Sequence, residues 1–285
     1  MAGAWRYAYA SVAGTSHDKN GSPCQDAGSC RVVETSGGGP VLLAMASDGA
    51  GSARRSEEGA HLAVALFLHD FGAACRQRGI AAIDRAFVLA WLTKLRRRIA
   101  ARAARAGSHS GDFACTALGA VIAADRAVFF QIGDGAIVVS GRHGPSGRHG
   151  PGEYDWVFWP QHGEFANTTN FVTQRDAARA LEIEIHDGPI EELAIFTDGI
   201  ERLVLDLAGK TAHAPFFRPL FRWLAATKPP VASETSPSLA HYLGSKQVCD
   251  RTDDDKTLIM ATRRPAAQER PSATHATAAK SASAG

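Results

Sequence analysis

The sequence predicts an α+β domain, in which strands and helices occupy separate stretches of the chain. Two long stretches between residues 56 and 106 have the apolar spacing of helices, and strand-like runs lie before and after them. The chain has 285 residues, of which 45% are hydrophobic, so it is long enough to bury a large core. Regular alternation of strand and helix, which is typical of a parallel sheet, is absent from this order.

The first elements are strands. Residues 5–14 (WRYAYASVAG) form the first predicted strand, and the polar run TSHDKNGSPCQDA after it predicts a loop. A second strand leads to the GGGP turn at residues 37–40, and VLLAMAS follows as an apolar strand that ends before Asp48.

The helical stretch begins near Ser56, which we expect to be the N-cap, with Glu57 and Glu58 in the first turn. A second helix is predicted over residues 80–106. Its apolar stripe contains Ile83, Phe87, Trp91, Leu95 and Ile99.

Strand patterns return after the helices. CTALGAVIAA and AVFFQIGDGAIVVS indicate two buried strands, and ALEIEIHDGPIEELAIFTDG indicates a hairpin. A helix is expected in HAPFFRPLFRWLAA, and residues 257–262 (TLIMAT) are the last predicted strand. We therefore expect a catalytic domain over residues 1–263 and a disordered tail, rich in Ala and Ser, over residues 264–285.

The bulk properties exclude several classes of protein. The net charge is only +2, so nothing in the total points to nucleic acid or to an anionic membrane. No apolar run approaches the roughly 18 residues that span a bilayer, and the first residues do not have the layout of a signal peptide. The five cysteines are scattered, which is typical of reduced thiols. We expect a cytoplasmic protein.

Three apolar runs end in Asp-Gly. These pairs are Asp48-Gly49, Asp134-Gly135 and Asp198-Gly199, and an acidic triplet, Asp253 to Asp255, stands just before the last strand. A carboxylate at the end of a buried strand is costly unless it is paired or bound to a metal ion. A fourth pair, Asp187-Gly188, follows the alternating run EIEIH and predicts an ordinary turn.

The residue types restrict the metal. Carboxylates with glycine carbonyls beside them form an all-oxygen ligand set, which suits Mg²⁺ or Mn²⁺ rather than zinc or copper. Several Asp residues from different strands indicate two adjacent ions, which in proteins activate water and stabilise phosphoryl transfer. The sequence therefore predicts the hydrolysis of a phosphate ester.

The ordered set of motifs resembles the metal-dependent protein serine/threonine phosphatases of the type 2C (PPM) family. The motifs are CQDA, SDGAGS, GDFACTALGAV, IGDGAIV, FTDGIE and DDDKTL, and GEFANTTNFVT (residues 163–173) resembles the flap of a bacterial branch. The resemblance covers nearly all of the chain except the tail. It implies a four-layer αββα sandwich of two antiparallel sheets flanked by helices, with the metal ions at one end.

The resemblance also implies a role for each matching residue. Asp48 would bridge two Mn²⁺ or Mg²⁺ ions, with support from the Gly49 carbonyl. Asp198 and Asp254 would hold the second ion, with a shift of one residue to Asp255 left open. Asp134 matches the ligand of a third ion in bacterial members, and Asp26 would order water as a catalytic residue. The implied partner is a phosphorylated protein, a substrate of a serine/threonine kinase.

Three positions depart from the family pattern. Gln25 replaces a metal-contacting Glu, and Ala50 replaces a His that protonates the leaving group in eukaryotic members. The arginine that grips the phosphate has no clear match, so His17 and Lys19 are the candidates, although His17 is equally well explained as a loop residue.

Two alternative functions remain open at this point. Gln25 and Ala50 are compatible with a weakly catalytic module that binds phosphoproteins for regulation. The basic stretch with Arg96, Arg97 and Arg98 is compatible with a metal-dependent nucleotide or nucleic-acid phosphohydrolase, although a solvated helix face explains it as well.

Overall fold

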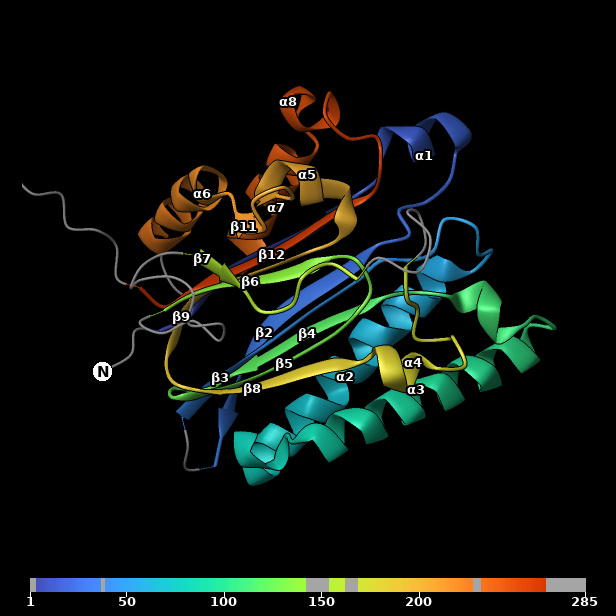
Figure 1. Ribbon diagram of the computed structural model, residues 1–285, viewed down its shortest axis with the longest axis horizontal. Helices are drawn as coiled ribbons and strands as arrows, with labels where there is room; N and C mark the ends of the chain where they lie inside the picture. The colour runs from blue at the N-terminus through green and yellow to red at the C-terminus, as the bar shows by residue number, and fades with distance from the viewer. Residues whose placement is uncertain (1–3, 37–38, 142–153, 162–168, 228–231, 265–285) are drawn as a thin grey trace, which may run out of the picture.

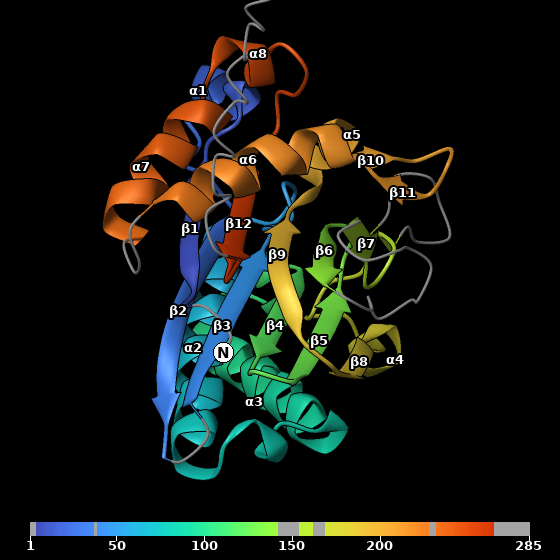
Figure 2. The same ribbon diagram turned by 90° about the vertical axis from the view of Figure 1, so that its left-hand side faces the viewer.

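Two five-stranded antiparallel sheets pack face to face, and helices cover both outer faces (Figures 1 and 2). The computed structural model describes residues 4–36, 39–141, 154–161, 169–227 and 232–264, with the side chains of 18–20 and 232–235 left out. The predicted α+β class and the four-layer αββα sandwich are both confirmed.

The first sheet contains, in spatial order, β1 (Arg6–Val12), β12 (Lys256–Thr262), β9 (Ile190–Phe196), β6 (Ala136–Gly141) and β7 (Tyr154–Trp156). The second contains β2 (Ala27–Thr35), β3 (Gly39–Ser47), β4 (Ala117–Ile122), β5 (Arg126–Ile132) and β8 (Glu182–Asp187). The chain passes from one sheet to the other after β1, β5, β7 and β8, so neither sheet is built from one continuous stretch of sequence. A small separate ribbon pairs β10 (Leu205–Asp206) with β11 (Thr211–Ala212).

Both faces of each sheet are buried, which explains the continuous apolar runs. In β3, Leu43 and Met45 pack toward helices, whereas Leu42 and Ala44 pack toward the other sheet. Side chains alternate between the faces of a strand, so a strand that lies between two apolar layers needs apolar residues at every position.

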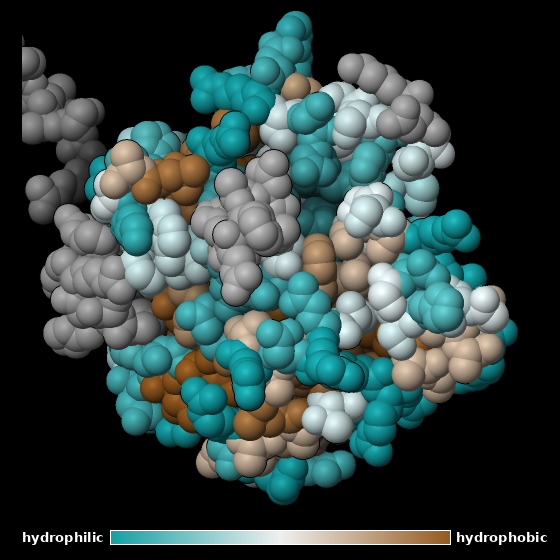
Figure 3. Space-filling view, turned by 45° about the vertical axis from the view of Figure 1, so that its right-hand side comes forward, coloured by the Kyte–Doolittle hydropathy of each residue, from teal (hydrophilic) through white to brown (hydrophobic). Residues whose placement is uncertain are grey.

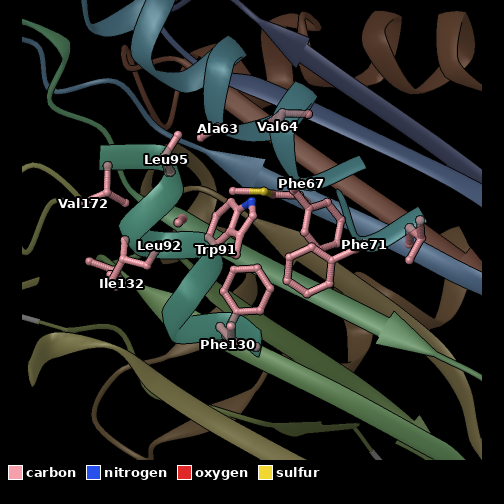
Figure 4. Packing of buried hydrophobic residues seen from close by; sticks show 14 of the residues in the cluster. Ala63, Val64, Phe67, Phe71, Trp91, Leu92, Leu95, Phe130, Ile132 and Val172 are labelled. Atoms are coloured by element: carbon pink, nitrogen blue, oxygen red, sulfur yellow. The ribbon is translucent and has the colours of Figure 1, made fainter. Parts of the chain in front are cut away.

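Two long helices cover the second sheet. They are α2 (Ser56–Arg78) and α3 (Arg85–Arg105), and Figure 4 shows Phe67, Phe71 and Trp91 from these helices gathered around Phe130 of β5. The ring centroids of Trp91 and Phe130 are 5.2 Å apart. Such aromatic packing adds to the stability that comes from apolar burial.

Shorter helices complete the molecule. α5 (Glu201–Val204), α6 (Ala214–Ala226) and α7 (Ala232–Leu243) pack on the outer face of the first sheet (Figure 1). The remaining helical segments are α1 (Thr15–Asn20), α4 (Ala177–Ala180), α8 (Lys246–Cys249) and the 3-10 turns η1 (Ile80–Ala82), η2 (Ser110–Phe113) and η3 (Asp198–Ile200).

Four sequence expectations need correction. Arg55, not Ser56, is the N-cap of α2, and the helix predicted over residues 80–106 is broken after η1, because Asp84 caps α3 by accepting a hydrogen bond from Phe87 N. The polar run after β1 contains the short helix α1.

The expected hairpin over β8 and β9 is wrong. β8 pairs with β5, and β9 pairs with β6 and β12, so the Asp187-Gly188 turn joins two different sheets.

The first residue of the predicted tail, Arg264, contacts the sheets. Its side chain forms an ion pair with Glu191 at 2.7 Å. Residues 265–285 lie outside the described part of the chain. All five cysteines are free thiols. Among the described residues, every helix is too short or too polar to cross a bilayer.

Candidate active site

Three carboxylates that are far apart in the sequence meet at one end of the two sheets. Asp48 follows β3 of one sheet, Asp198 follows β9 of the other, and Asp134 lies in the crossing between β5 and β6. Each offers a carboxylate oxygen, and these three oxygens all lie within 4.8 Å of one another. The arrangement can hold divalent cations, because it is made of oxygen donors alone.

Two of the neighbouring glycines are required by close packing. A Cβ atom on Gly49 would lie 2.7 Å from the Gln25 carbonyl oxygen. A Cβ atom on Gly199 would lie 1.8 Å from the Asp255 carbonyl oxygen. Both separations are shorter than van der Waals contact, so only glycine allows these backbone segments to approach beside Asp48 and Asp198.

The electrostatics of the cluster favour a bound cation. Burial raises the pKa of Asp48 well above its usual range, and the neighbouring charges of Asp26, Asp198 and Asp134 raise it further. Burial and the charges of Asp134 and Asp254 raise the pKa of Asp198 to about 6. Carboxylates that repel one another in a buried place are stabilised in their charged form by a divalent ion.

Asp26 lies beside the cluster and is almost fully buried, with 2% of its surface exposed. Thr197 Oγ1 donates a 2.7 Å hydrogen bond to Asp26 Oδ2. The other oxygen, Oδ1, is buried and has no hydrogen-bond partner within the described chain. Burial is the main reason why the pKa of Asp26 rises to about 7. An orphaned acceptor of this kind suits a water molecule or another polar group as its partner.

Asp254 and Asp255 of the acidic triplet have different surroundings. The Asp255 carboxylate accepts hydrogen bonds from Gly14 N at 2.7 Å and from Gln25 N at 2.6 Å, so it is committed to holding the loops around β1 and β2. Asp254 is exposed, and its charge contributes to the raised pKa of Asp198. Asp254 is therefore near Asp198, and its Oδ1 accepts a single 2.8 Å hydrogen bond, from the neighbouring Asp255 N. It lies outside the group of three carboxylates.

The two candidate phosphate-binding residues, His17 and Lys19, lie in the short helix α1. His17 Nδ1 lies 3.0 Å from Asp255 Oδ1, so this ring faces the structural acid of the triplet. The side chain of Lys19 is outside the described residues, as is the 163–168 part of the segment that resembles a flap. The assignment of phosphate binding to His17 and Lys19 stays a prediction.

Gln25 contributes an unusual polar atom. Its amide Oε1 is buried and lacks a hydrogen-bond partner among the described residues, while its backbone N–H is bonded to Asp255. Ala50, next to Gly49, offers no side chain that can donate a proton. The two departures from the family pattern therefore have different effects. Gln25 leaves an unpaired hydrogen-bond acceptor, and Ala50 leaves no side chain that could act as a general acid.

Several supporting residues were not evident as a group from the sequence. Thr116 holds the end of β3: its Oγ1 accepts a 2.8 Å hydrogen bond from Asp48 N, and its own N–H donates to Asp48 O. Thr197 and the fully buried Lys256, whose Nζ donates to Asp254 O at 3.0 Å, were missed. Threonine is common in strands, and a buried lysine has no periodic signature, so only the three-dimensional arrangement reveals them.

Comparison with known proteins agrees with this geometry. The sequence profile of the family described as "Protein phosphatase 2C" matches residues 13–244. The chain is 37% identical over 257 residues to Serine/threonine-protein phosphatase 3 of Escherichia coli (strain K12), which covers 90% of this chain and 98% of the relative.

Solved structures share the fold. The serine/threonine phosphatase Stp1 from Staphylococcus aureus superposes with a TM-score of 0.58 at 14% identity, covering 90% of this chain and 94% of its own. The serine/threonine phosphatase of S. agalactiae superposes with a TM-score of 0.54 at 13% identity, covering 90% and 99%. With the profile match and the 37% identical relative, these observations lead to one assignment: the chain belongs to the protein phosphatase 2C family.

Proposed function

We propose that this phosphatase hydrolyses phosphoserine and phosphothreonine in proteins, using two divalent ions, Mn²⁺ or Mg²⁺, and a water molecule as the nucleophile. The observation that carries the proposal is the meeting of Asp48, Asp134 and Asp198, whose carboxylate oxygens lie within 4.8 Å of one another. The 37% identical relative is named as a serine/threonine-protein phosphatase, which supports the choice of substrate.

The ligands of the ions follow from the placement of the acids. Asp48 is close to the other acids of the site, because the charges of Asp26, Asp198 and Asp134 all raise its pKa. We assign it the bridging position, with the Gly49 carbonyl beside it. We assign Asp198 and Asp254 to one ion and Asp134 to a third, weaker site. Divalent ions in such a centre lower the pKa of water and neutralise the charge that develops on the transferred phosphoryl group.

The protein groups have complementary tasks. Asp26 presents its unpaired Oδ1 within the buried site, and we assign it the orientation of the attacking water. Thr197 fixes the Asp26 carboxylate, and Thr116 fixes the main chain at Asp48. Cys115, which pairs with Gly49 through a backbone bridge beside Asp48, has no part in this scheme, because burial raises the pKa of its thiol to about 12.

The basic helix favours a structural role over contact with nucleic acid. Arg96 donates to the carbonyl oxygens of Val172 and Gln174, and Arg102 forms a 2.9 Å ion pair with Glu58. These side chains are therefore used to join parts of the same chain, although Arg97 and Arg98 are exposed.

The test is an assay of metal dependence on phosphopeptides. Purified protein is treated with EDTA, desalted and assayed on matched phosphoserine, phosphothreonine and phosphotyrosine peptides, with Mn²⁺ or Mg²⁺ added back. The proposal expects hydrolysis of the first two only when metal is returned. Full activity without metal contradicts it. Tight binding of phosphopeptide without turnover supports the regulatory alternative, and a preference for nucleotides supports the nuclease-type alternative.

A further inference from the structure

Two adjoining pockets extend from the metal-binding acids along the outer surface of α5 and α8. The first pocket has a volume of about 320 Å³ and includes Asp198 and Asp254 in its lining. The second has a volume of about 210 Å³. Leu203 and Arg251 line both, so the two pockets form one groove that begins at the candidate active site.

The part of the groove next to the acids carries two cations without acidic partners. Arg202 and Arg251 are exposed, and neither side chain forms a hydrogen bond or ion pair with another part of the described chain. Asp253 is the exposed acid of the lining that is left once Asp198 and Asp254 are neutralised by bound ions. Glu201 is almost completely buried, with 8% of its surface exposed. When Asp198 and Asp254 hold an ion as proposed, the exposed charges that remain on the rim are Arg202 and Arg251 against Asp253. This balance favours anionic groups of a ligand.

The far part of the groove combines aromatic and aliphatic side chains with the polar residues His213, Gln247 and Arg251. Phe216, Tyr242 and Leu203 are half-buried there, and the ring centroids of Phe216 and Tyr242 are 6.3 Å apart. Its volume of about 210 Å³ suits one bulky apolar side chain. Arg251 stands between the two parts, since it lines both pockets.

The surroundings make this recess distinctive. Leu207 is the one large hydrophobic residue that is exposed among the described residues. The face in Figure 3 is mostly hydrophilic, with hydrophobic side chains gathered mainly in its lower half. An accessible aromatic recess that continues from the active site is therefore a specific feature rather than part of a general apolar surface.

We propose that this groove binds the phosphoprotein substrate on one side of the phosphorylated residue, an inference that rests on the proposed function. An acidic side chain next to the phosphoserine or phosphothreonine contacts Arg202 and Arg251. A bulky apolar side chain further along the same segment fills the recess of Leu203, Phe216 and Tyr242. The segment 265–285 of this chain is a poor occupant, because it contains no Leu, Ile, Val, Met, Phe, Tyr or Trp.

The test uses a set of matched phosphothreonine peptides. They carry Glu, Lys or Ala beside the phosphothreonine, and Leu or Ala at each successive position on either side. The readout is kcat/KM for each peptide divided by that for p-nitrophenyl phosphate, which has no neighbouring residues that could contact the groove. We expect a preference for Glu over Lys of roughly fivefold and a preference for Leu over Ala, at one position, of about tenfold or more.

Two variants connect these preferences to the groove. Arg251→Met removes the charge and keeps a long side chain, and it should lose the preference for Glu over Lys. Phe216→Ala opens the recess and should lose the preference for Leu over Ala. Each preference is a ratio measured in one preparation, so partial unfolding of a variant cancels. Arg98→Met, on α3, is the matched control and should keep both preferences. Equal rates on all peptides, or preferences that survive in Arg251→Met and Phe216→Ala, overturn the proposal.

Binding measurements separate this proposal from the proposed function. The anisotropy of labelled peptides is measured with the Asp48→Asn variant, which does not consume them. If the wild-type protein hydrolyses neither p-nitrophenyl phosphate nor any peptide, the proposed function is wrong, and the groove is judged by binding alone. Selective binding that is lost on Arg251→Met still supports it, and unselective binding refutes it.

Discussion

Thr197 joins the two sheets at the candidate active site through its hydrogen bond to Asp26. The Thr197 hydroxyl donates to Asp26 Oδ2 at 2.7 Å and accepts from Thr257 N at 3.0 Å, and all three groups are buried. Asp26 directly precedes β2 of one sheet, whereas Thr197 follows β9 of the other, and Thr257 is in β12 beside it. One hydroxyl therefore couples a catalytic candidate to the strand end that carries Asp198.

Replacement of Thr197 should separate the role of the hydroxyl from that of packing. Thr197→Val keeps the shape but leaves Asp26 and Thr257 N short of a partner, so we expect a loss of about 1–3 kcal/mol in the free energy of unfolding. The phosphatase rate should also fall, because the Asp26 carboxylate is no longer fixed. Thr197→Ser keeps the hydroxyl and should retain most of the rate. Equal rates for the Val and Ser variants would show that the hydrogen bond has no catalytic relevance.

Asp48 and Asp187 provide a matched pair, since both precede glycine. Asp48→Asn removes a charge from the proposed bridging position, and we expect the rate to fall by several orders of magnitude, equivalent to several kcal/mol in the activation free energy. The metal-free protein should be at least as stable as the wild type, because the remaining acids repel one another less.

Asp187→Asn is the control. Asp187 is 80% exposed, and its ion pair with Arg126 at 3.0 Å is a surface contact of about 0–1 kcal/mol. Its rate should stay near that of the wild type. The measurements are the phosphatase rate and the melting temperature without metal, and a high rate in Asp48→Asn or a lost rate in Asp187→Asn would contradict the site assignment.

Removal of metal should destabilise the fold as well as abolish activity. Ions that bind the native carboxylates and not the unfolded chain stabilise the protein by about 2.7 kcal/mol at a concentration one hundred times the dissociation constant. We therefore expect the melting temperature to rise with added Mn²⁺ or Mg²⁺, and the rise to be largely absent in Asp48→Asn. A wild-type melting temperature that does not change with added Mn²⁺ or Mg²⁺ would argue against a metal site at these acids.

The metal-free protein should become less stable as the pH rises from about 4 to about 7. The pKa of Asp26 is about 7 and that of Asp198 about 6 in the folded protein, both above the roughly 3.9 of an unfolded Asp. Between these values the native state holds more protons than the unfolded chain, so the free energy of unfolding falls with increasing pH. The measurement is the melting temperature in EDTA across this range, and Asp26→Asn should flatten the slope. A wild-type melting temperature that rises over the same pH range would refute the raised pKa values of Asp26 and Asp198.

Gln25→Glu should strengthen metal binding. The buried Oε1 of Gln25 lacks a partner in the described structure, and a carboxylate at the same place would add a negative charge close to Gly51. We expect the Mn²⁺ concentration for half-maximal rate to fall by about tenfold, which corresponds to 1.4 kcal/mol. An unchanged or higher requirement would show that residue 25 does not face the ions.

The sequence predicts the layers and the acids better than the connections between them. Asp48, Asp134 and Asp198 stand out because each interrupts a continuous apolar run, and such runs occur where a strand is buried on both faces. The β8–β9 hairpin was predicted wrongly because a turn such as Asp187-Gly188 has the same local chemistry whether the following strand pairs with the previous one or crosses to another sheet.

The choice between Asp254 and Asp255 shows a similar limit. The two are neighbours with identical side chains, and only the placement of Gly14 and Gln25 in space commits Asp255 to main-chain hydrogen bonds. Arg202 and Arg251 could not be predicted from the sequence for the same reason. An exposed arginine in a groove has the same sequence surroundings as one on an ordinary surface.

The repeated crossing of the chain between the sheets affects when activity arises during synthesis. β12 is the last described strand to be made, yet it lies between β1 and β9 in the first sheet. Until it leaves the ribosome, β1 has no neighbouring strand in its sheet, Thr197 has no Thr257 to bond, and Asp254 and Asp255 are not in place. A nascent chain that already carries Asp48, Asp134 and Asp198 is therefore catalytically silent, and phosphatase activity begins only when the final strand closes the sheet.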